Sequence, residues 1–146
     1  MTTVTEILKG KPEAVTHTIS PGASVFEAVK LMALKNIGAL LVVEAGKVVG
    51  IVTERDYARK IALLERVSKD TPVSEIMSSP VMYVHPQQTC EECMALMTEN
   101  RLRHLPVISA GELVGLISIG DLVKDIISQQ RFIIEQLEHY IAGDLA

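Results

Sequence analysis

An internal duplication constrains this sequence more than any other feature. When the 146-residue chain is compared with itself at an offset of 65 residues, identical residues coincide without a gap between residues 20 and 57. The coinciding pairs include Pro21 and Pro86, Glu27 and Glu92, Val42 and Val107, Gly46 and Gly111, Gly50 and Gly115, and Asp56 and Asp121. Upstream, an offset of 69 aligns residues 4–8 with 73–77, so the first copy carries four extra residues around Lys9–Pro12. Because a half of about 60 residues buries little apolar surface alone, we expect the two copies to pack face to face.

Each copy predicts the same order of helices and strands. Its first long helix follows a Ser or Thr with Glu three residues later, the pattern of a capping box, at Ser24 and Thr89. Two strands of apolar residues then flank an Ala-Gly pair, which predicts a hairpin. In the first copy the expected elements are a helix at 4–8, a strand at 15–19, a helix after Ser24, strands at 39–43 and 48–53, and a helix at 56–66. In the second copy they are a helix at 73–77, a strand at 81–84, a helix after Thr89, strands at 104–108 and 113–118, and a helix from Asp121.

The last helix is predicted to run from Asp121 to about Ile141, well past the end of the repeat. The sequence therefore divides into a first repeat at 1–66, a second repeat at 67–128 and a helical extension at 129–146. Isoleucine and leucine recur along the extension at helical spacing. Two interpretations are open: this face packs against its own chain, or it docks on another subunit.

Composition excludes several classes of protein. The net charge is −4 and only five residues are Tyr or Phe, so neither a basic nucleic-acid surface nor a set of base-stacking platforms is expected. No apolar run approaches the ~20 residues that span a bilayer, and the N-terminus lacks a signal-peptide pattern. Two cysteines give no disulfide framework, which favours a reducing compartment. We therefore expect a cytoplasmic protein without nucleic-acid partners or membrane insertion.

The end of each hairpin carries the most informative chemistry. Thr53 and Ser118 each end a strand at the start of a helix, where backbone N–H groups suit a phosphate. Asp56 and Asp121 follow three residues later, and an ionised carboxylate accepts hydrogen bonds from the two hydroxyls of a ribose. Small and aliphatic neighbours, among them Ala39, offer a slot for an adenine. The alternative is that these residues only cap the closing helices.

The two motifs carry a family resemblance. Gly50-Ile-Val-Thr53-Glu-Arg55-Asp56 is matched by Gly115-Leu-Ile-Ser118-Ile-Gly-Asp121, each after the same pair of strands. With the segments 36–43 and 101–108, the chain resembles a pair of cystathionine β-synthase (CBS) domains, the Bateman module, from Val4 to Lys124. The resemblance implies an α/β (α+β) fold of two repeats about a pseudo-twofold, with the C-terminal helix as an extension. It also implies AMP, ADP, ATP, NAD or S-adenosylmethionine bound in clefts between the repeats.

Residue by residue, the resemblance implies two composite ligand-binding sites. The first would consist of Thr53, Arg55, Asp56, Ser79, Pro80, Val81, Arg101 and Leu102. The second would consist of Lys9, Ala14, Ile37, Gly38, Arg103, His104, Ser118 and Asp121. The copies differ in charge, because Arg103-His104 aligns with Gly38-Ala39 and Arg55 aligns with Gly120. Since guanidinium groups clamp phosphates, we expect the two sites to prefer different ligands, with AMP, NAD or ATP the expected bound nucleotides.

The expected role is regulatory and not enzymatic. No triad, carboxylate pair or metal-ligand set stands at matched positions, so no catalytic or metal-binding residues are predicted. Such a module would be a homodimer that signals to a regulated protein through ligand-dependent repacking. One alternative is an interaction protein whose clefts have lost their ligand. The other is a thiol-redox enzyme using the C-x-x-C pair Cys90 and Cys93, although both align with apolar positions of the first copy.

Overall fold

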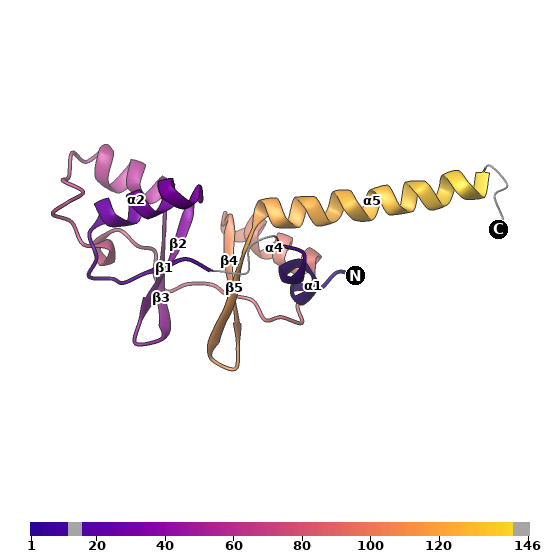
Figure 1. Ribbon diagram of the computed structural model, residues 1–146, viewed down its shortest axis with the longest axis horizontal. Helices are drawn as coiled ribbons and strands as arrows, with labels where there is room; N and C mark the ends of the chain where they lie inside the picture. The colour runs from indigo at the N-terminus through magenta and orange to yellow at the C-terminus, as the bar shows by residue number, and fades with distance from the viewer. Residues whose placement is uncertain (12–15, 142–146) are drawn as a thin grey trace. The chain divides into compact units, whose positions relative to one another are not determined.

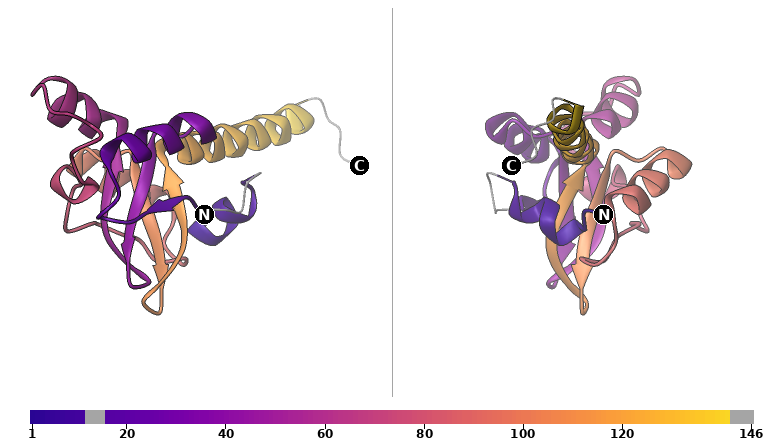
Figure 2. Two further views of the ribbon diagram at one scale, coloured as in Figure 1. Left: turned by 60° about the vertical axis from the view of Figure 1, so that its left-hand side comes forward. Right: turned by 90° about the vertical axis from the view of Figure 1, so that its right-hand side faces the viewer.

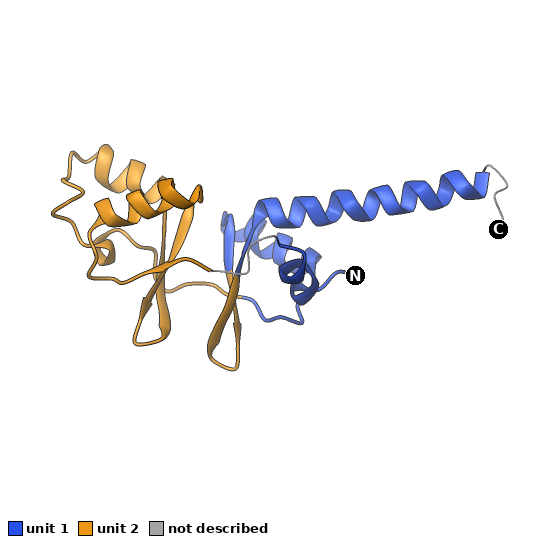
Figure 3. Cartoon of the chain, viewed as in Figure 1, with its two compact units in different colours: residues 1–14, 84–105, 116–146 blue, residues 15–83, 106–115 orange. Residues whose placement is uncertain are grey.

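The computed structural model describes residues 1–11 and 16–141 and has a mixed α/β architecture with a long C-terminal helix (Figure 1). The chain forms two compact units, and each unit takes segments from both repeats (Figure 3). Unit 1 consists of residues 1–14, 84–105 and 116–146, and unit 2 consists of residues 15–83 and 106–115. The mixed fold with two repeats and a terminal helix agrees with the sequence prediction.

Unit 2 is built on a three-stranded sheet in the order β1-β2-β3. Strand β1 (Thr18–Ile19) runs parallel to β2 (Ala39–Glu44), which pairs antiparallel with β3 (Lys47–Thr53). The turn between β2 and β3, seen in Figure 2, has positive φ at Ala45 (51°) and Gly46 (78°), as a two-residue hairpin of the favoured twist requires. The helical elements of this unit are α2 (Val25–Lys35), α3 (Glu54–Tyr57), the π-helical turn Ala58–Ala62 and the 3₁₀ turn Val73–Glu75.

The core of unit 2 is formed by apolar side chains of α2, which recur at helical spacing, and of the sheet, which alternate along each strand. Ser24 caps α2 by accepting a hydrogen bond from the Glu27 N–H at 3.1 Å, which starts the helix where the sequence predicts. Helical spacing then buries three residues of one face, and alternation buries one face of the strands. The buried cluster is Val25, Ala28, Met32, Leu40, Val42, Val52, Ile61, Val73 and Ile76.

Unit 1 is mainly helical. It contains α1 (Val4–Lys9), α4 (Cys90–Asn100) and α5 (Ile119–Ile141), and α5 contacts both of the others. Strands β4 (His104–Ser109) and β5 (Glu112–Ser118) pair, and the tip of their hairpin belongs to unit 2. The predicted capping box is complete at Thr89, whose hydroxyl accepts from the Glu92 N–H while Glu92 accepts from the Thr89 N–H.

The two repeats exchange their first helical segments. In unit 2 the Val25 N–H donates to Thr71 O and the Val73 N–H to Ala23 O, both at 2.8 Å. In unit 1 the equivalent bonds run from Cys90 N–H to Thr2 O at 2.9 Å and from Val4 N–H to Gln88 O at 2.8 Å. Each unit is thus completed by the short helix of the other repeat, so the compact units differ from the sequence repeats.

Some expected elements are shorter or absent. Residues 81–83 form no strand and Val84 makes a single bridge, so the strand predicted at 81–84 is wrong; Pro80 and Pro86 flank this segment and have no N–H to donate. The strand expected at 15–19 is reduced to Thr18–Ile19, and Val15 lies outside the described residues. The helix predicted at 56–66 is instead α3 followed by a π-helical turn. The final helix extends to Ile141, the last residue described, in agreement with the prediction.

Candidate functional site

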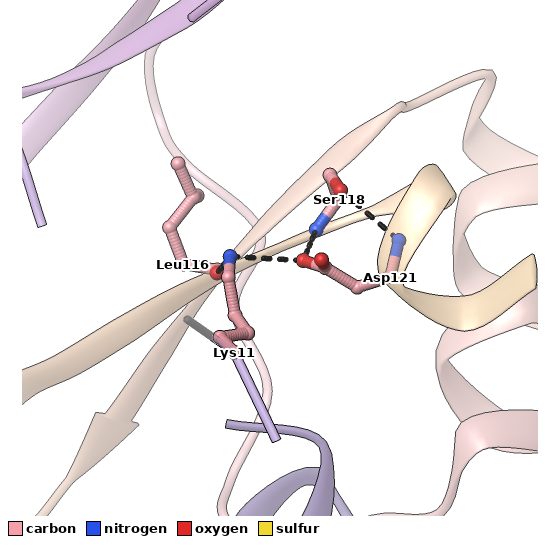
Figure 4. A network of polar contacts seen from close by, with 4 residues as sticks. All are labelled: Lys11, Leu116, Ser118 and Asp121. Atoms are coloured by element: carbon pink, nitrogen blue, oxygen red, sulfur yellow. Dashed lines mark hydrogen bonds and ion pairs between the residues drawn. The ribbon is translucent and has the colours of Figure 1, made fainter. Parts of the chain in front are cut away.

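The strand-to-helix turn of unit 1 brings Ser118 and Asp121 into reciprocal hydrogen bonds (Figure 4). The Ser118 N–H donates to Asp121 Oδ2 at 2.9 Å, and the Asp121 N–H donates to Ser118 Oγ at 3.2 Å. Strand β5 ends here and α5 begins, so both side chains satisfy backbone groups that the helix start leaves without partners. The helix-capping interpretation is therefore realised in the structure, and it fixes the position of the carboxylate.

Lys11 completes this turn with a positive charge. Its Nζ lies 2.9 Å from Asp121 Oδ2 and also donates to Leu116 O at 2.9 Å (Figure 4). Both side chains are mostly buried, with 29% of Lys11 and 18% of Asp121 exposed. Burial by itself would raise the pKa of Asp121, but hydrogen bonds from Ser118 and Lys11 and the charge of Lys11 outweigh it, so that the pKa lies below 3.8. Asp121 is thus an ionised acceptor held in a fixed place.

Arg103 and His104 lie beside the same turn. The Ile119 N–H donates to Arg103 O at 2.9 Å, which ties the start of β4 to the start of α5. Burial lowers the pKa of His104 below 6.5, the charges of Lys11 and Arg103 lower it further, and the charge of Asp121 acts in the opposite direction. Unit 1 therefore holds the Lys11 ammonium group on the Asp121 carboxylate, with the backbone of Arg103 and the partly buried His104 beside the same turn. Cationic groups of this kind can bind an anion next to a hydroxyl-binding carboxylate.

Unit 2 repeats the arrangement with different residues. Thr53 and Asp56 form a capping box: the Thr53 N–H donates to Asp56 Oδ2 at 2.9 Å, and the Asp56 N–H donates to Thr53 Oγ1 at 3.1 Å. Lys60, four residues after Asp56, places its Nζ 3.4 Å from Asp56 Oδ1 and donates to Ile76 O at 2.8 Å. Each aspartate therefore has a lysine partner that also donates to a backbone carbonyl, but the two lysines are not related by the duplication.

Gly38 and Ala39 lie beside Thr53 in unit 2. Ala39 is the register partner of Thr53, and the Glu54 N–H donates to Gly38 O at 3.1 Å. A Cβ at Gly38 would lie 3.3 Å from Glu54 Oε1, so an acidic side chain covers the position where the second repeat has Arg103. The two turns thus share the same hydrogen bonds between the end of the strand and the start of the helix, and they differ in the charged side chains nearby.

The segment Ser79–Val81 also belongs to unit 2 and runs on from a bridge to β3. Ile51 and Ser78 exchange two backbone hydrogen bonds, of 3.1 and 2.9 Å. This close approach needs Gly50, because a Cβ there would lie 2.5 Å from Met77 Sδ and 3.1 Å from Ser78 O. The predicted first site therefore has Thr53, Asp56 and the residues after Ser78 on one unit.

The remaining predicted residues have simpler surroundings. Arg101 ends α4 in the left-handed conformation, and the Leu102 N–H donates to Met97 O at 2.9 Å. Lys9 and Arg55 are exposed, and Ile37 packs against the unit 2 core. Ala14 lies outside the described residues. The joining of these residues into two composite sites stays a prediction.

Three residues of the turns were missed by the sequence analysis. Lys60 stands four residues after Asp56, a helical spacing at which opposite charges meet, so it could have been found. Glu54 is the residue after the strand end and has no acidic equivalent in the second copy. Lys11 belongs to the four-residue insertion of the first copy, so the duplication gives it no counterpart and no signal pointed to it.

Cys90 and Cys93 are both fully buried on the inner face of α4, as the sequence predicts. Burial raises the pKa of Cys90 to about 12, and a hydrogen bond and negative charge from Asp125 add to the effect. Burial and the charge of Glu92 raise the pKa of Cys93 to about 11. A nucleophilic thiolate at neutral pH is therefore disfavoured at both positions, which argues against the thiol-redox alternative.

Within residues 1–11 and 16–141, no three His, Cys, Asp or Glu side chains are placed to hold a metal ion together. Among the same residues, none of the helices combines the length and the apolar character needed to cross a bilayer. The cytoplasmic location stays a prediction.

Comparison with known proteins identifies the family. The model of the CBS domain matches the chain twice, at residues 4–63 and 73–128. The chain belongs to the CBS-domain family. CBS domains form regulatory and signal-transduction modules, so this is a CBS-domain protein of that general class. The two matches contain both aspartate turns described above.

Three similar proteins match this chain along most of their own length. The mitochondrial CBS domain-containing protein CBSX3 of Arabidopsis thaliana is 38% identical over 150 residues, covering 97% of this chain and 73% of that protein. The CBS domain-containing protein YhcV of Bacillus subtilis (strain 168) is 36% identical over 113 residues, covering 77% of this chain and 80% of YhcV. A solved structure of a protein with CBS domains from Burkholderia ambifaria MC40-6 is 59% identical, with a TM-score of 0.85, covering 88% of this chain and 96% of that one.

Proposed function

We propose that this CBS-domain protein binds an adenosine-containing ligand (AMP, ADP, ATP, NAD or S-adenosylmethionine) at its aspartate turns and transmits binding to a regulated partner. The observation that carries the proposal is the duplicated turn itself. Asp56 and Asp121 are each held by the N–H and hydroxyl-bearing side chain of a residue that ends a strand, and each has a lysine partner. Chance placement of two surface aspartates would not give both the same backbone partners.

The chemistry of a ribose suits this turn. Two neighbouring hydroxyls donate to the two oxygens of one carboxylate. At Asp121, Ser118 and Lys11 both bind Oδ2, and Oδ1 accepts no hydrogen bond from the described residues. The carboxylate is already ionised and oriented before a ligand arrives, so little conformational entropy is lost when it binds. Lys11 and Arg103, at the start of the 23-residue α5, offer positive charge for a phosphate.

The two turns are expected to differ in affinity. The unit 1 turn has Lys11, Arg103 and His104 beside it. The unit 2 turn has Lys60 and the exposed Arg55, but the acidic Glu54 over Gly38 offsets part of their positive charge. A phosphate-bearing ligand should therefore bind more tightly at Asp121. Titration calorimetry with AMP should give two classes of site, or one class that Asp121→Asn removes. Two identical and independent sites would contradict this part of the proposal.

A thermal-shift assay tests ligand binding directly. The protein is heated with AMP, ATP, NAD or S-adenosylmethionine, and a ligand at ~100 times its Kd should add about 2.7 kcal/mol to the free energy of unfolding. Asp56→Asn and Asp121→Asn keep one oxygen that can accept the capping N–H but lose the second hydroxyl acceptor, so each should reduce the shift. Asp70→Asn is the matched control, because it removes the same charge from an exposed position.

The outcome separates the proposal from its main alternative. If none of the four compounds shifts the unfolding temperature, and if mass spectrometry finds no nucleotide bound to the purified protein, the nucleotide proposal fails. The protein would then be an interaction module without a ligand. Glu54 favours that second candidate for the first repeat, because its carboxylate lies where a phosphate would be repelled.

A regulatory role requires that ligand binding and partner binding be coupled. The proposed repacking has two states, which differ in how the repeats pack together. Ligand binding can change the affinity for a partner by no more than the difference between the ligand's affinities for these two states. We expect the protein to act as a homodimer on a regulated protein partner. Nucleotide-dependent capture of that protein would support the coupling, and capture that is independent of nucleotide would contradict it.

A further inference from the structure

The second half of α5 is exposed to solvent. Every residue from 130 to 141 is exposed, and Figure 1 shows this part of the helix continuing past α1 and α4 of the same unit. Its contacts with unit 1 come from its first half, where Leu122 is fully buried. Large apolar side chains are nevertheless exposed beyond it, including Ile134 (53%), Leu137 (55%) and Ile141 (83%). A protruding apolar helix of this kind is marginally stable in water alone.

The spacing of the exposed side chains is that of a coiled-coil seam. Successive gaps of four and three residues separate Val123, Ile127, Gln130, Ile134, Leu137 and Ile141. This is the 3.5-residue repeat by which two helices keep one stripe facing each other. Ile133 and Tyr140 widen the stripe on one flank, and Arg131 and Glu138 border it on the other. The partner that fits is therefore another helix with the same repeat.

The charges on the flank decide the identity and direction of the partner. Arg131 and Glu138 stand one heptad apart, each directly after a seam position. In an antiparallel pair of identical helices centred between residues 135 and 136, Arg131 of each copy faces Glu138 of the other. The same alignment places Ile134 against Leu137 and Ile133 against Tyr140. A parallel pair would place Glu138 opposite the flank of Ile133 and leave both charges without partners.

We propose that residues 127–141 of α5 pair antiparallel with the same segment of a second copy of this chain. The inference rests on the homodimer of the proposed function and names the surface that forms it. It does not depend on whether a nucleotide binds. The pairing buries the apolar stripe of both copies and joins opposite charges twice by symmetry.

Sedimentation equilibrium of the full chain tests the surface. The wild-type protein should be a dimer, and Ile134→Asp should raise the dimer Kd by about 100-fold or more, because it buries two unpaired carboxylates at the seam. Phe132→Asp is the matched control, since it adds the same charge on the opposite face of the helix and should leave the dimer intact. Circular dichroism confirms that each variant is folded, and the fold of unit 1 does not bury Ile134.

Charge exchange tests the pairing of the flanks. Arg131→Glu alone should raise the dimer Kd by about tenfold, because it places two carboxylates opposite each other twice. Adding Glu138→Arg should restore the wild-type Kd. Spin labels at Ser128→Cys of the two copies test the direction of pairing. In an antiparallel pair centred between residues 135 and 136, the two labels lie on opposite sides of the centre, about fifteen residues apart along the axis, or about 22 Å at about 1.5 Å per residue. In a parallel pair they lie side by side, only about 10 Å apart.

Each result decides the inference. A monomeric wild-type protein, a dimer unchanged by Ile134→Asp, or one that Phe132→Asp also dissociates would overturn it. Failure of the charge exchange to restore the dimer, or a short distance between the labels at residue 128, would overturn the antiparallel arrangement. The thermal shift with AMP is measured separately on wild-type and Ile134→Asp protein. A dimer that shows no shift would refute AMP binding and leave this inference standing.

Discussion

Lys11 Nζ lies 2.9 Å from Asp121 Oδ2, although 110 residues separate the two positions in the chain. The lysine comes from the insertion that distinguishes the first repeat, and the aspartate comes from the duplicated motif of the second. The contact therefore joins a residue that only the first copy has to a motif that both copies share. It also gives the second aspartate turn a cation that the motif itself does not supply.

Removing this cation should change both stability and ionisation. Lys11→Met should raise the pKa of Asp121 toward 3.8 and reduce the free energy of unfolding by about 1 kcal/mol at neutral pH. Because the folded-state pKa is depressed, the stabilisation from Asp121 is present above pH 3.8 and is lost as the pH falls below it. Carbon-13 NMR of the carboxyl group and urea unfolding measure the two effects. Lys9→Met, on the exposed surface of α1, is the control that should change neither.

His104 should make stability depend on pH in the weakly acidic range. Burial, with the charges of Lys11 and Arg103, depresses its pKa below 6.5 against the opposing charge of Asp121. The unfolded chain then binds the proton more readily, so the stabilisation is complete above pH 6.5 and is lost as the pH falls through the depressed pKa. Urea unfolding at several pH values should show this slope, and His104→Gln should flatten it. An unchanged slope in the variant would assign the pH dependence to other groups.

The close approach at Gly50 should tolerate no side chain. Gly50→Ala would place a Cβ 2.5 Å from Met77 Sδ and 3.1 Å from Ser78 O, and we expect it to cost about 1–3 kcal/mol of stability. The sulfur can move but the carbonyl belongs to the bridge with Ile51. Gly22→Ala is the control, because nothing lies within 4 Å of its Cβ. If adding Met77→Ala restores the stability of Gly50→Ala, the side chain is the obstacle; if it does not, the backbone is.

Local signals in the sequence predicted most of the fold. Ser24 and Thr89 start their helices where the capping pattern places them, and both Ala-Gly turns take positive φ. The prediction of a strand at 81–84 was wrong, because an apolar composition alone does not supply the backbone hydrogen-bond donors and the neighbouring strand that a strand needs. The helix expected at 56–66 failed because its apolar spacing does not distinguish an α-helix from a π-helical turn.

The candidate site was predictable only where the duplication repeats it. Both aspartates and both strand-end hydroxyls were found because each copy confirms the other. The lysines were not, since Lys11 and Lys60 reach their aspartates from positions with no equivalent in the other repeat. The exchange of the first helical segments was not predicted either. Because the two segments are similar in sequence, each could pack against either repeat, and only tertiary packing determines which one it contacts.

Cys90 and Cys93 should be inert toward thiol reagents in the folded protein. Cys90 begins α4, where the helix dipole would favour a thiolate, but burial and the charges of Asp125 and Glu91 raise its pKa to about 12; the pKa of Cys93 is about 11. Labelling with a disulfide reagent at neutral pH should therefore be slow in buffer and fast in denaturing urea. Ala95→Cys, exposed on the same helix, should label at once and report that the reagent is active. Fast native labelling of the wild-type chain would show that α4 opens readily and would return the C-x-x-C pair to consideration as a redox site.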